Sequence, residues 1–171
     1  PPNARYVPYY LHSGGSANTR LGDGVLSTVP PEDEPQDMYT YDPDDPVPSL
    51  GGHNLSIPLG VQDQRPVQER RDVLVFTSDP LDRPVEVTGP IALKLWAAST
   101  APDTDFTAKL VDVQPDGYAR NLVDGIIRAR YRASSTSPAP IEPGRVYEYT
   151  IDLWATSNVF LPGHRIQVEI S

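Results

Sequence analysis

Twenty prolines are spread through this chain of 171 residues, and they constrain its fold more than any other feature. Proline fixes φ and lacks a backbone N–H, so it interrupts helices and the interior of sheets. The residue before each proline is also pushed out of the α region, as in YDPDDPVPSLGG, residues 41–52. With twelve glycines besides, the sequence predicts many turns, no long helix and an irregular, extended arm over residues 1–63.

From residue 72 onward, apolar and polar residues alternate with the period of two that is typical of strands. We expect strands at 72–78, 85–89, 91–99, 105–113, 125–132, 143–154 and 162–171, with shorter ones at 9–12 and 25–28. The last strand sets Ile166, Val168 and Ile170 opposite a polar row that includes Gln167 and Glu169. This pattern predicts an all-β fold, an antiparallel jelly-roll sandwich with its core in residues 64–171 and the arm as part of the same domain.

The composition excludes several classes of function. A net charge of −9 argues against nucleic acid and against anionic membrane surfaces, because both need a basic face. The chain has no cysteine, which excludes disulfides and thiolate metal sites and is compatible with either a cytoplasmic or a secreted bacterial protein. No apolar run approaches the roughly 20 residues that span a bilayer. The opening PPNARYVPYYLHSGG is typical of the interior of a longer protein.

The sequence offers no recognisable catalytic machinery. An α/β-hydrolase needs the nucleophile motif G-x-S-x-G, and the nearest stretch, SGGSANT, has Asn18 where the second glycine should stand. The three histidines, His12, His53 and His164, are the only candidates for a general base of that type, and the sequence pairs none of them with a nucleophile and an orienting acid. We therefore expect no catalytic residue in this chain and no cofactor.

Two acidic runs, Asp42–Asp45 and Asp103–Asp105, raise the question of a metal site. Calcium favours clustered carboxylates, but neither run has the EF-hand spacing with its central glycine and terminal glutamate. A structural calcium and a purely structural role are both compatible with DTD at 103–105, and we predict the structural role, with no bound metal.

The structural hypothesis gives each aspartate a partner. Asp103 follows Pro102, so its side chain can accept backbone N–H groups and shape the turn. Asp105 opens a strand on the face opposite Phe106. A later expected strand carries Arg128 and Arg130 on its polar face, so one of these guanidinium groups can reach the carboxylate if the two strands are neighbours.

Two apolar features have no obvious place in a core. The loop Gly51–Gln62 carries Leu55, Ile57 and Leu59, and exposed apolar groups in a loop on a rigid sandwich are typical of a binding site. Trp96 and Trp154 fall opposite the apolar rows of their strands. They could form a sugar-stacking face, as in a free-standing carbohydrate-binding jelly roll, or they could be ordinary packing residues.

Several long motifs together resemble one known family. These are YDPDDPVPSLGG at 41–52, DQRPVQERRDVLVFTS at 63–78, GPIALKLWAASTAPDTDFTAKLVDVQPDGYARNLVDGIIRARYR at 89–132 and PGRVYEYTIDLWATSNVFLPGHRIQVEIS at 143–171. In this order they resemble the C-terminal non-catalytic domain of the X-Pro dipeptidyl-peptidase family of serine hydrolases, to which cocaine esterases and α-amino-acid ester hydrolases belong.

The resemblance implies a galactose-binding-like jelly roll that packs on the α/β-hydrolase and cap domains of the same parent chain. It places the catalytic triad upstream of this chain and the loop Gly51–Gln62 near the acyl pocket. The parent would act on an acyl ester, an amide or an X-Pro peptide, and the domain would support homo-oligomer contacts. Family members continue past VEIS with a further strand, so the resemblance also implies a domain truncated at its C-terminus.

Overall fold

The computed structural model describes residues 4–52 and 58–171 of the chain. The strands of that part are β1 Tyr10–His12, β2 Val25–Ser27, β3 Leu74–Thr77, β4 Val85–Ala97, β5 Asp105–Val113, β6 Ala119–Arg128, β7 Tyr147–Phe160 and β8 Arg165–Ile170. Its helices are α1, Arg65–Gln68, and the short 3₁₀ helix η1, Ala129–Tyr131. In the described residues, no helix has the length and apolar character needed to cross a bilayer.

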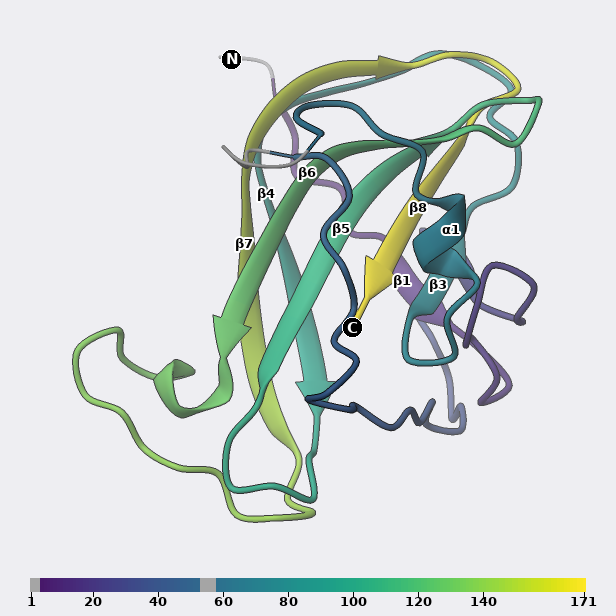
Figure 1. The fold of residues 1–171 in the computed structure, drawn as a ribbon. Helices are drawn as coiled ribbons and strands as arrows, with labels where there is room; N and C mark the ends of the chain where they lie inside the picture. The colour runs from purple at the N-terminus through teal and green to yellow at the C-terminus, as the bar shows by residue number, and fades with distance from the viewer. Residues whose placement is uncertain (1–3, 53–57) are drawn as a thin grey trace.

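The strands form two sheets that face each other (Figure 1). The larger sheet has the order β1-β2-β3-β8-β5-β6, and the smaller is a ribbon of β4 paired with β7. Neighbouring strands are antiparallel except β2 and β3, which run parallel through the pair Val25 and Thr77. The predicted all-β sandwich is therefore confirmed.

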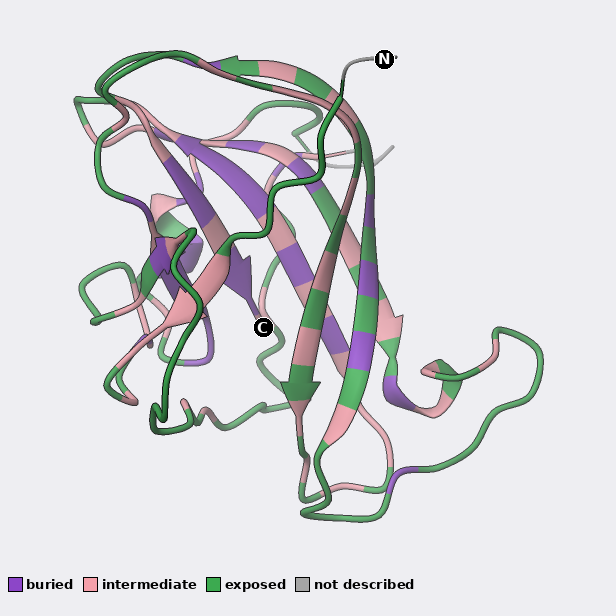
Figure 2. Ribbon diagram, turned by 180° about the vertical axis from the view of Figure 1, so that it is seen from behind, coloured by how far each residue is buried: buried purple, intermediate pink, exposed green. Residues whose placement is uncertain are grey.

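The core lies between the sheets, and it follows from alternation within each strand (Figure 2). Buried members include Phe106, Ala108 and Leu110 from β5 and Tyr149, Ile151 and Leu153 from β7. The rings of Phe106 and Tyr149 pack with their centroids 4.8 Å apart. Each large apolar side chain buried in this way contributes roughly 1.5–3 kcal/mol to folding.

Gly125 allows the two sheets to approach closely beside β6. A Cβ added at this position would lie 2.1 Å from the backbone carbonyl oxygen of Asp152 in β7. No real Cβ tolerates that distance, so the close approach of β6 to β7 depends on a residue without a side chain.

Four of the predicted strand ranges differ clearly from the structure. The ranges 85–89 and 91–99 belong to one strand, β4, which runs through Pro90 with only a local shift of register. Proline is tolerated there because β4 pairs with β7 along one edge only. A residue on the open edge needs no backbone N–H for the sheet. The strand expected at 125–132 instead begins at Ala119 and ends at Arg128, where η1 takes over. The strand expected at 143–154 continues to Phe160.

The arm and α1 form a further layer on the outer face of the six-stranded sheet. Val67, Val73 and Val75 form a second buried cluster there, against which Val47 and Leu50 of the arm pack. The strand β8 is therefore buried on both faces: its apolar row faces the ribbon and its polar row lies beneath α1.

Candidate functional site

A buried polar cluster lies between α1 and the six-stranded sheet. It consists of Gln64 and Gln68 beside and within α1, Lys109 of β5, and Gln167 and Glu169 of β8. The Gln68 amide donates to Gln167 Oε1 at 2.5 Å and to Glu169 Oε1 at 2.7 Å. Lys109 Nζ donates to Gln64 Oε1 at 3.1 Å and lies 3.5 Å from Glu169 Oε2. The cluster thus ties the helix to two interior strands.

Glu169 is the electrostatically critical member of this cluster. Burial raises the pKa of its carboxyl group, and the nearby Lys109 ammonium and the Gln68 amide offset only part of this effect. The buried carboxylate is tolerated because it has a charged partner in Lys109 and accepts a hydrogen bond from Gln68, both of which an isolated buried charge would lack.

A pocket of about 370 Å³ beside the cluster is lined by three arginines, Arg20, Arg65 and Arg165. Arg20 is paired with Glu69, Arg65 is paired with Asp63, and Arg165 donates to the backbone carbonyl of Ser78 at 2.8 Å. Two of the three positive charges are therefore neutralised by carboxylates of the same chain. The remaining positive charge is small for an anion-binding site.

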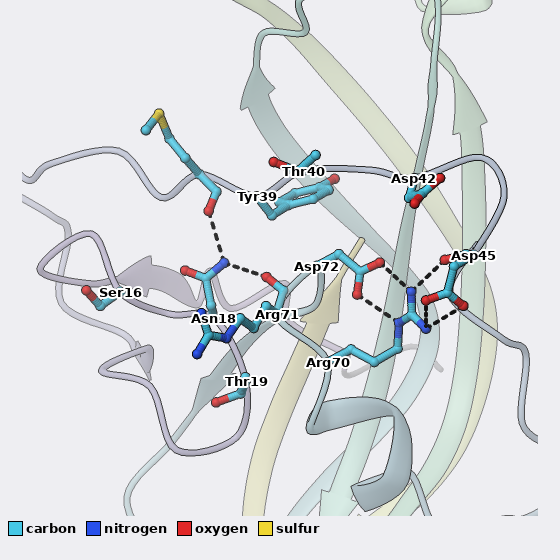
Figure 3. Close-up of a pocket in the computed structure, with 11 residues that line it drawn as sticks. Ser16, Asn18, Thr19, Tyr39, Thr40, Asp42, Asp45, Arg70, Arg71 and Asp72 are labelled. Carbon is cyan, nitrogen blue, oxygen red and sulfur yellow. Dashed lines mark hydrogen bonds and ion pairs between the residues drawn. The ribbon is translucent and has the colours of Figure 1, made fainter.

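A larger and open pocket of about 900 Å³ follows the seam between the arm and the chain entering β3 (Figure 3). Arg70 bridges Asp72 and Asp45, and Asn18 donates to the backbone carbonyls of Met38 and Arg71. These groups are used to fasten the arm, and Figure 3 shows them pointing toward one another rather than into the open space. Burial beside Asp72 also raises the pKa of Tyr39, another lining residue, to about 12.

The loop Gly51–Gln62 has a well-defined base. Gly52 and Gly60 exchange backbone hydrogen bonds of 2.8 and 3.1 Å, and the Asn121 side chain of β6 accepts from Gln62 N–H at 2.7 Å. Leu59 is 56% exposed beside this base. The two other predicted loop residues, Leu55 and Ile57, lie outside the described residues.

The structure brings together the four polar residues considered at the DTD stretch. Arg128 binds the Asp105 carboxylate through two hydrogen bonds of 2.8 Å, since the two residues are direct partners in the β5–β6 pairing. Asp103 accepts from the backbone N–H of Arg130 at 2.9 Å, and its other oxygen lies 2.7 Å from Arg130 Nε. Asp105 raises the pKa of Arg128 through these hydrogen bonds.

One histidine superficially imitates a catalytic triad. Ser27 Oγ lies 3.3 Å from His12 Nε2, and His12 Nδ1 lies 2.7 Å from Glu34 Oε1. However, His12 Nε2 also faces the carbonyl of Val29 at 2.9 Å, so it must carry a proton and cannot serve as a base toward Ser27. The hydrogen bond from His12 lowers the pKa of Glu34. The arrangement ties Val29 and Glu34, later in the arm, to β1.

In the part of the chain that the structure describes, His164 adds no second arrangement of this kind. His164 Nδ1 lies 2.7 Å from a nearly buried oxygen of Asp112, which ties the turn before β8 to β5. His53 lies outside the described residues. Within residues 4–52 and 58–171, no three His, Asp or Glu side chains converge as a metal site would require.

The two tryptophans lie on the outer face of the β4–β7 ribbon, with exposed fractions of 62% for Trp96 and 75% for Trp154. Trp96 pairs with Glu148, whereas Trp154 lies at the register shift near Pro90. They are therefore about five residues apart along β4, or roughly 16 Å at the rise of a strand. At that spacing they do not form one stacking platform for a single sugar ring.

The buried polar cluster was not predicted from the sequence. Gln167 and Glu169 alternate with apolar residues as they would in a strand with one face in water, and Gln64 and Gln68 lie in a proline-containing stretch. The one available signal was the spacing of those two glutamines, which places them on the same side of a helical turn.

Comparisons with known proteins agree with the predicted resemblance. Residues 1–171 match the family described as the X-Pro dipeptidyl-peptidase C-terminal non-catalytic domain. The cocaine esterase of Rhodococcus sp. (strain MB1 Bresler) is 54% identical over 99% of this chain and 30% of its own length.

Two solved structures share both fold and sequence. An aminopeptidase from a marine sediment Thaumarchaeota archaeon is 32% identical with a TM-score of 0.79, over 96% of this chain and 29% of its own. An α-amino acid ester hydrolase is 30% identical with a TM-score of 0.80, over 98% of this chain and 29% of its own. The chain thus spans under a third of the length of these relatives.

We predict that Asp103 and Asp105 act as structural ion-pair partners and bind no metal. Asp103→Ala should lower the free energy of unfolding by about 1–3 kcal/mol, because it removes a backbone hydrogen bond as well as an ion pair. Asp105→Ala should cost less, because its pair with Arg128 is largely exposed. Thermal melts with and without EDTA test the alternative: a chelator-dependent loss of stability that calcium restores would identify a ligand set.

A second prediction concerns Glu169 and pH. Folded Glu169 holds its proton more tightly than at the ordinary pKa of 4.5, so its ionisation costs folding free energy. The contribution of Glu169 to the free energy of unfolding is therefore greatest below pH 4.5, and it is lost as the pH rises through the raised pKa. Glutamine does not ionise, so Glu169→Gln should gain stability relative to wild type as pH rises.

Urea unfolding at a series of pH values measures this difference. The matched control is Glu148→Gln, which alters an exposed glutamate paired with Lys94 and should show no such gain. A difference between Glu169→Gln and wild type that stays constant across the acidic range would contradict the prediction.

Proposed function

This chain belongs to the family of X-Pro dipeptidyl-peptidase C-terminal non-catalytic domains, and we propose that its parent is a serine hydrolase of acyl esters or amides. The observation that carries the proposal is the 54% identity to a cocaine esterase over nearly the whole chain. Relatives whose names describe an aminopeptidase and an α-amino acid ester hydrolase support a range of amide and ester substrates, and the description of the family adds X-Pro peptides to that range.

In this proposal the domain does no chemistry by itself. It packs on the α/β-hydrolase and cap domains of the parent, covers one side of the catalytic domain and shapes the mouth of the active site. The loop Gly51–Gln62 is the segment that we assign to that mouth, with Leu55, Ile57 and Leu59 as its apolar contacts. The hydrogen-bonded base of the loop supports this role, because it fixes the two points at which the loop leaves and rejoins the domain.

The activity is tested by assaying the full-length protein and the isolated chain against p-nitrophenyl esters and X-Pro anilides. The full-length protein should turn over at least one ester or amide, and the isolated chain should remain at the buffer rate. Turnover by the isolated chain that survives repurification and falls on His164→Ala would contradict the proposal. A full-length protein that is inactive on every acyl substrate would contradict it as well.

The loop assignment predicts that Leu59→Ser in the full-length protein changes relative rates among acyl substrates more than it changes thermal stability. Leu59 is 56% exposed in this chain, so its loss should remove little core packing. Leu21→Ser is the matched control, since Leu21 is 77% exposed in a different loop and should change neither property. If Leu59→Ser lowers the melting temperature and leaves the ratio of rates fixed, the residue serves packing and the assignment fails.

A further inference from the structure

Trp154 is displayed to solvent in an unfavourable backbone conformation. Its φ is +66°, in the left-handed region, and its side chain is 75% exposed. For a bulky residue a positive φ is an outlier, because Cβ crowds the following carbonyl oxygen. A large exposed apolar side chain held in this way gains nothing visible from its own chain.

A bulge in the ribbon produces this display. Ala92 pairs with Asp152 and Pro90 pairs with Ala155, so Leu153 and Trp154 together lie opposite one residue of β4. Leu153 stays in the core at 2% exposure, and Trp154 is the extra residue turned outward. The Trp154 N–H donates to Asp152 Oδ1 at 2.8 Å, which holds the turn in this conformation.

The residues that flank the bulge are mostly apolar. Pro90, Ala92 and Ala155, which flank Trp154, are all exposed. The nearest charged pair along the outer face is Lys94 with Glu148. Sugar recognition requires several polar groups converging near the aromatic ring, and one oxygen of Asp152, the adjacent carboxylate, is already used by the Trp154 N–H.

We propose that Trp154, with Pro90, Ala92 and Ala155, forms the surface by which this domain docks on the catalytic domain of its own protein. The proposal rests on the proposed function, because it takes the parent to contain that catalytic domain. Tryptophan in the centre of an apolar patch is the residue type that most often dominates the energy of an interface.

Two further observations favour this occupant. The relatives are more than three times as long as this chain, so a large body of protein remains to be placed against the domain. In both ribbon views the N-terminal segment passes on the ribbon side of the six-stranded sheet, and its exposed apolar residues Tyr6 and Val7 lie in that segment (Figures 1 and 2). The β4–β7 ribbon, which carries Trp154, and this segment therefore lie on the same side of the six-stranded sheet.

Hydroxyl-radical labelling of the intact full-length protein, read out by mass spectrometry, tests the proposal. Trp96 is the internal reference, because it lies on the same ribbon at ordinary strand geometry. Relative to Trp96, Trp154 should be oxidised several-fold more slowly in the native protein than in the urea-unfolded protein. Equal protection factors for the two tryptophans would overturn the proposal, and so would protection of Trp154 that disappears on dilution to the monomer, which would indicate a second copy as the occupant.

The variant Trp154→Gly adds a second test, because the proposal and its alternative predict different changes in melting temperature. If Trp154 is free in the full-length protein, glycine relieves the left-handed strain and the melting temperature rises or stays unchanged. If Trp154 is docked, the loss of the anchor lowers the melting temperature of the full-length protein and speeds proteolysis between the domains, and Trp154→Phe restores part of both. Trp96→Ala is the matched control and should change neither.

The outcomes separate this inference from the proposed function. An active hydrolase in which Trp154 is labelled as readily as Trp96 would overturn the docking surface and leave the proposed function intact. Protection of Trp154 in a full-length protein without acyl-hydrolase activity would support the docking surface and contradict the activity.

Discussion

The burial of β8 on both faces is the constraint on which the rest of the structure depends. This strand lies between β3 and β5, with Ile166 and Ile170 buried against the ribbon and Gln167 and Glu169 buried beneath α1. A strand buried on both faces needs two covering layers. The β4–β7 ribbon supplies one, and α1 with the arm supplies the other. Removing α1 together with the arm would expose the polar cluster to water and separate Glu169 from Gln68, one of the two groups that make its burial tolerable.

The arm packs as a layer because side chains form the hydrogen bonds and ion pairs that its backbone cannot form. Its prolines remove N–H donors and exclude a regular ladder, yet they also reduce the entropy lost on folding. Asp37 accepts from the Ser13 hydroxyl and from the Ala17 N–H, and Arg70 reaches Asp45 from the opposite side of the seam. The acidic residues of the arm, which could have been taken for metal ligands, are thus in part the means by which an irregular segment is held on a sheet.

The sequence predicted those parts of the fold that depend on local periodicity. The bounds of β5, 105–113, follow from its alternation, and the Asp105–Arg128 contact could be anticipated because a hairpin brings both residues to neighbouring strands. The polar cluster could not be anticipated in this way. A period of two distinguishes the faces of a strand but does not say whether the polar face meets water or another layer. The contact of Lys109 with Gln64 depends on how the arm returns across the sheet, which no local pattern specifies.

In the described chain, two non-glycine residues have a positive φ, Thr19 and Trp154. They differ in whether the domain itself compensates the backbone strain. Thr19 is compensated within the domain: its N–H donates to the carbonyl of Val73 at 2.9 Å, and its own carbonyl accepts from Gly22 N–H at 3.1 Å. The first bond joins the arm to the residue before β3, the second closes the turn within the arm, and together they account for the strained turn. Trp154 has one such bond, from its N–H to Asp152, and its indole covers no core. Strain of this kind persists only when something outweighs it. Since the domain itself supplies little at Trp154, this contrast with Thr19 supports the proposed docking of Trp154 on the catalytic domain.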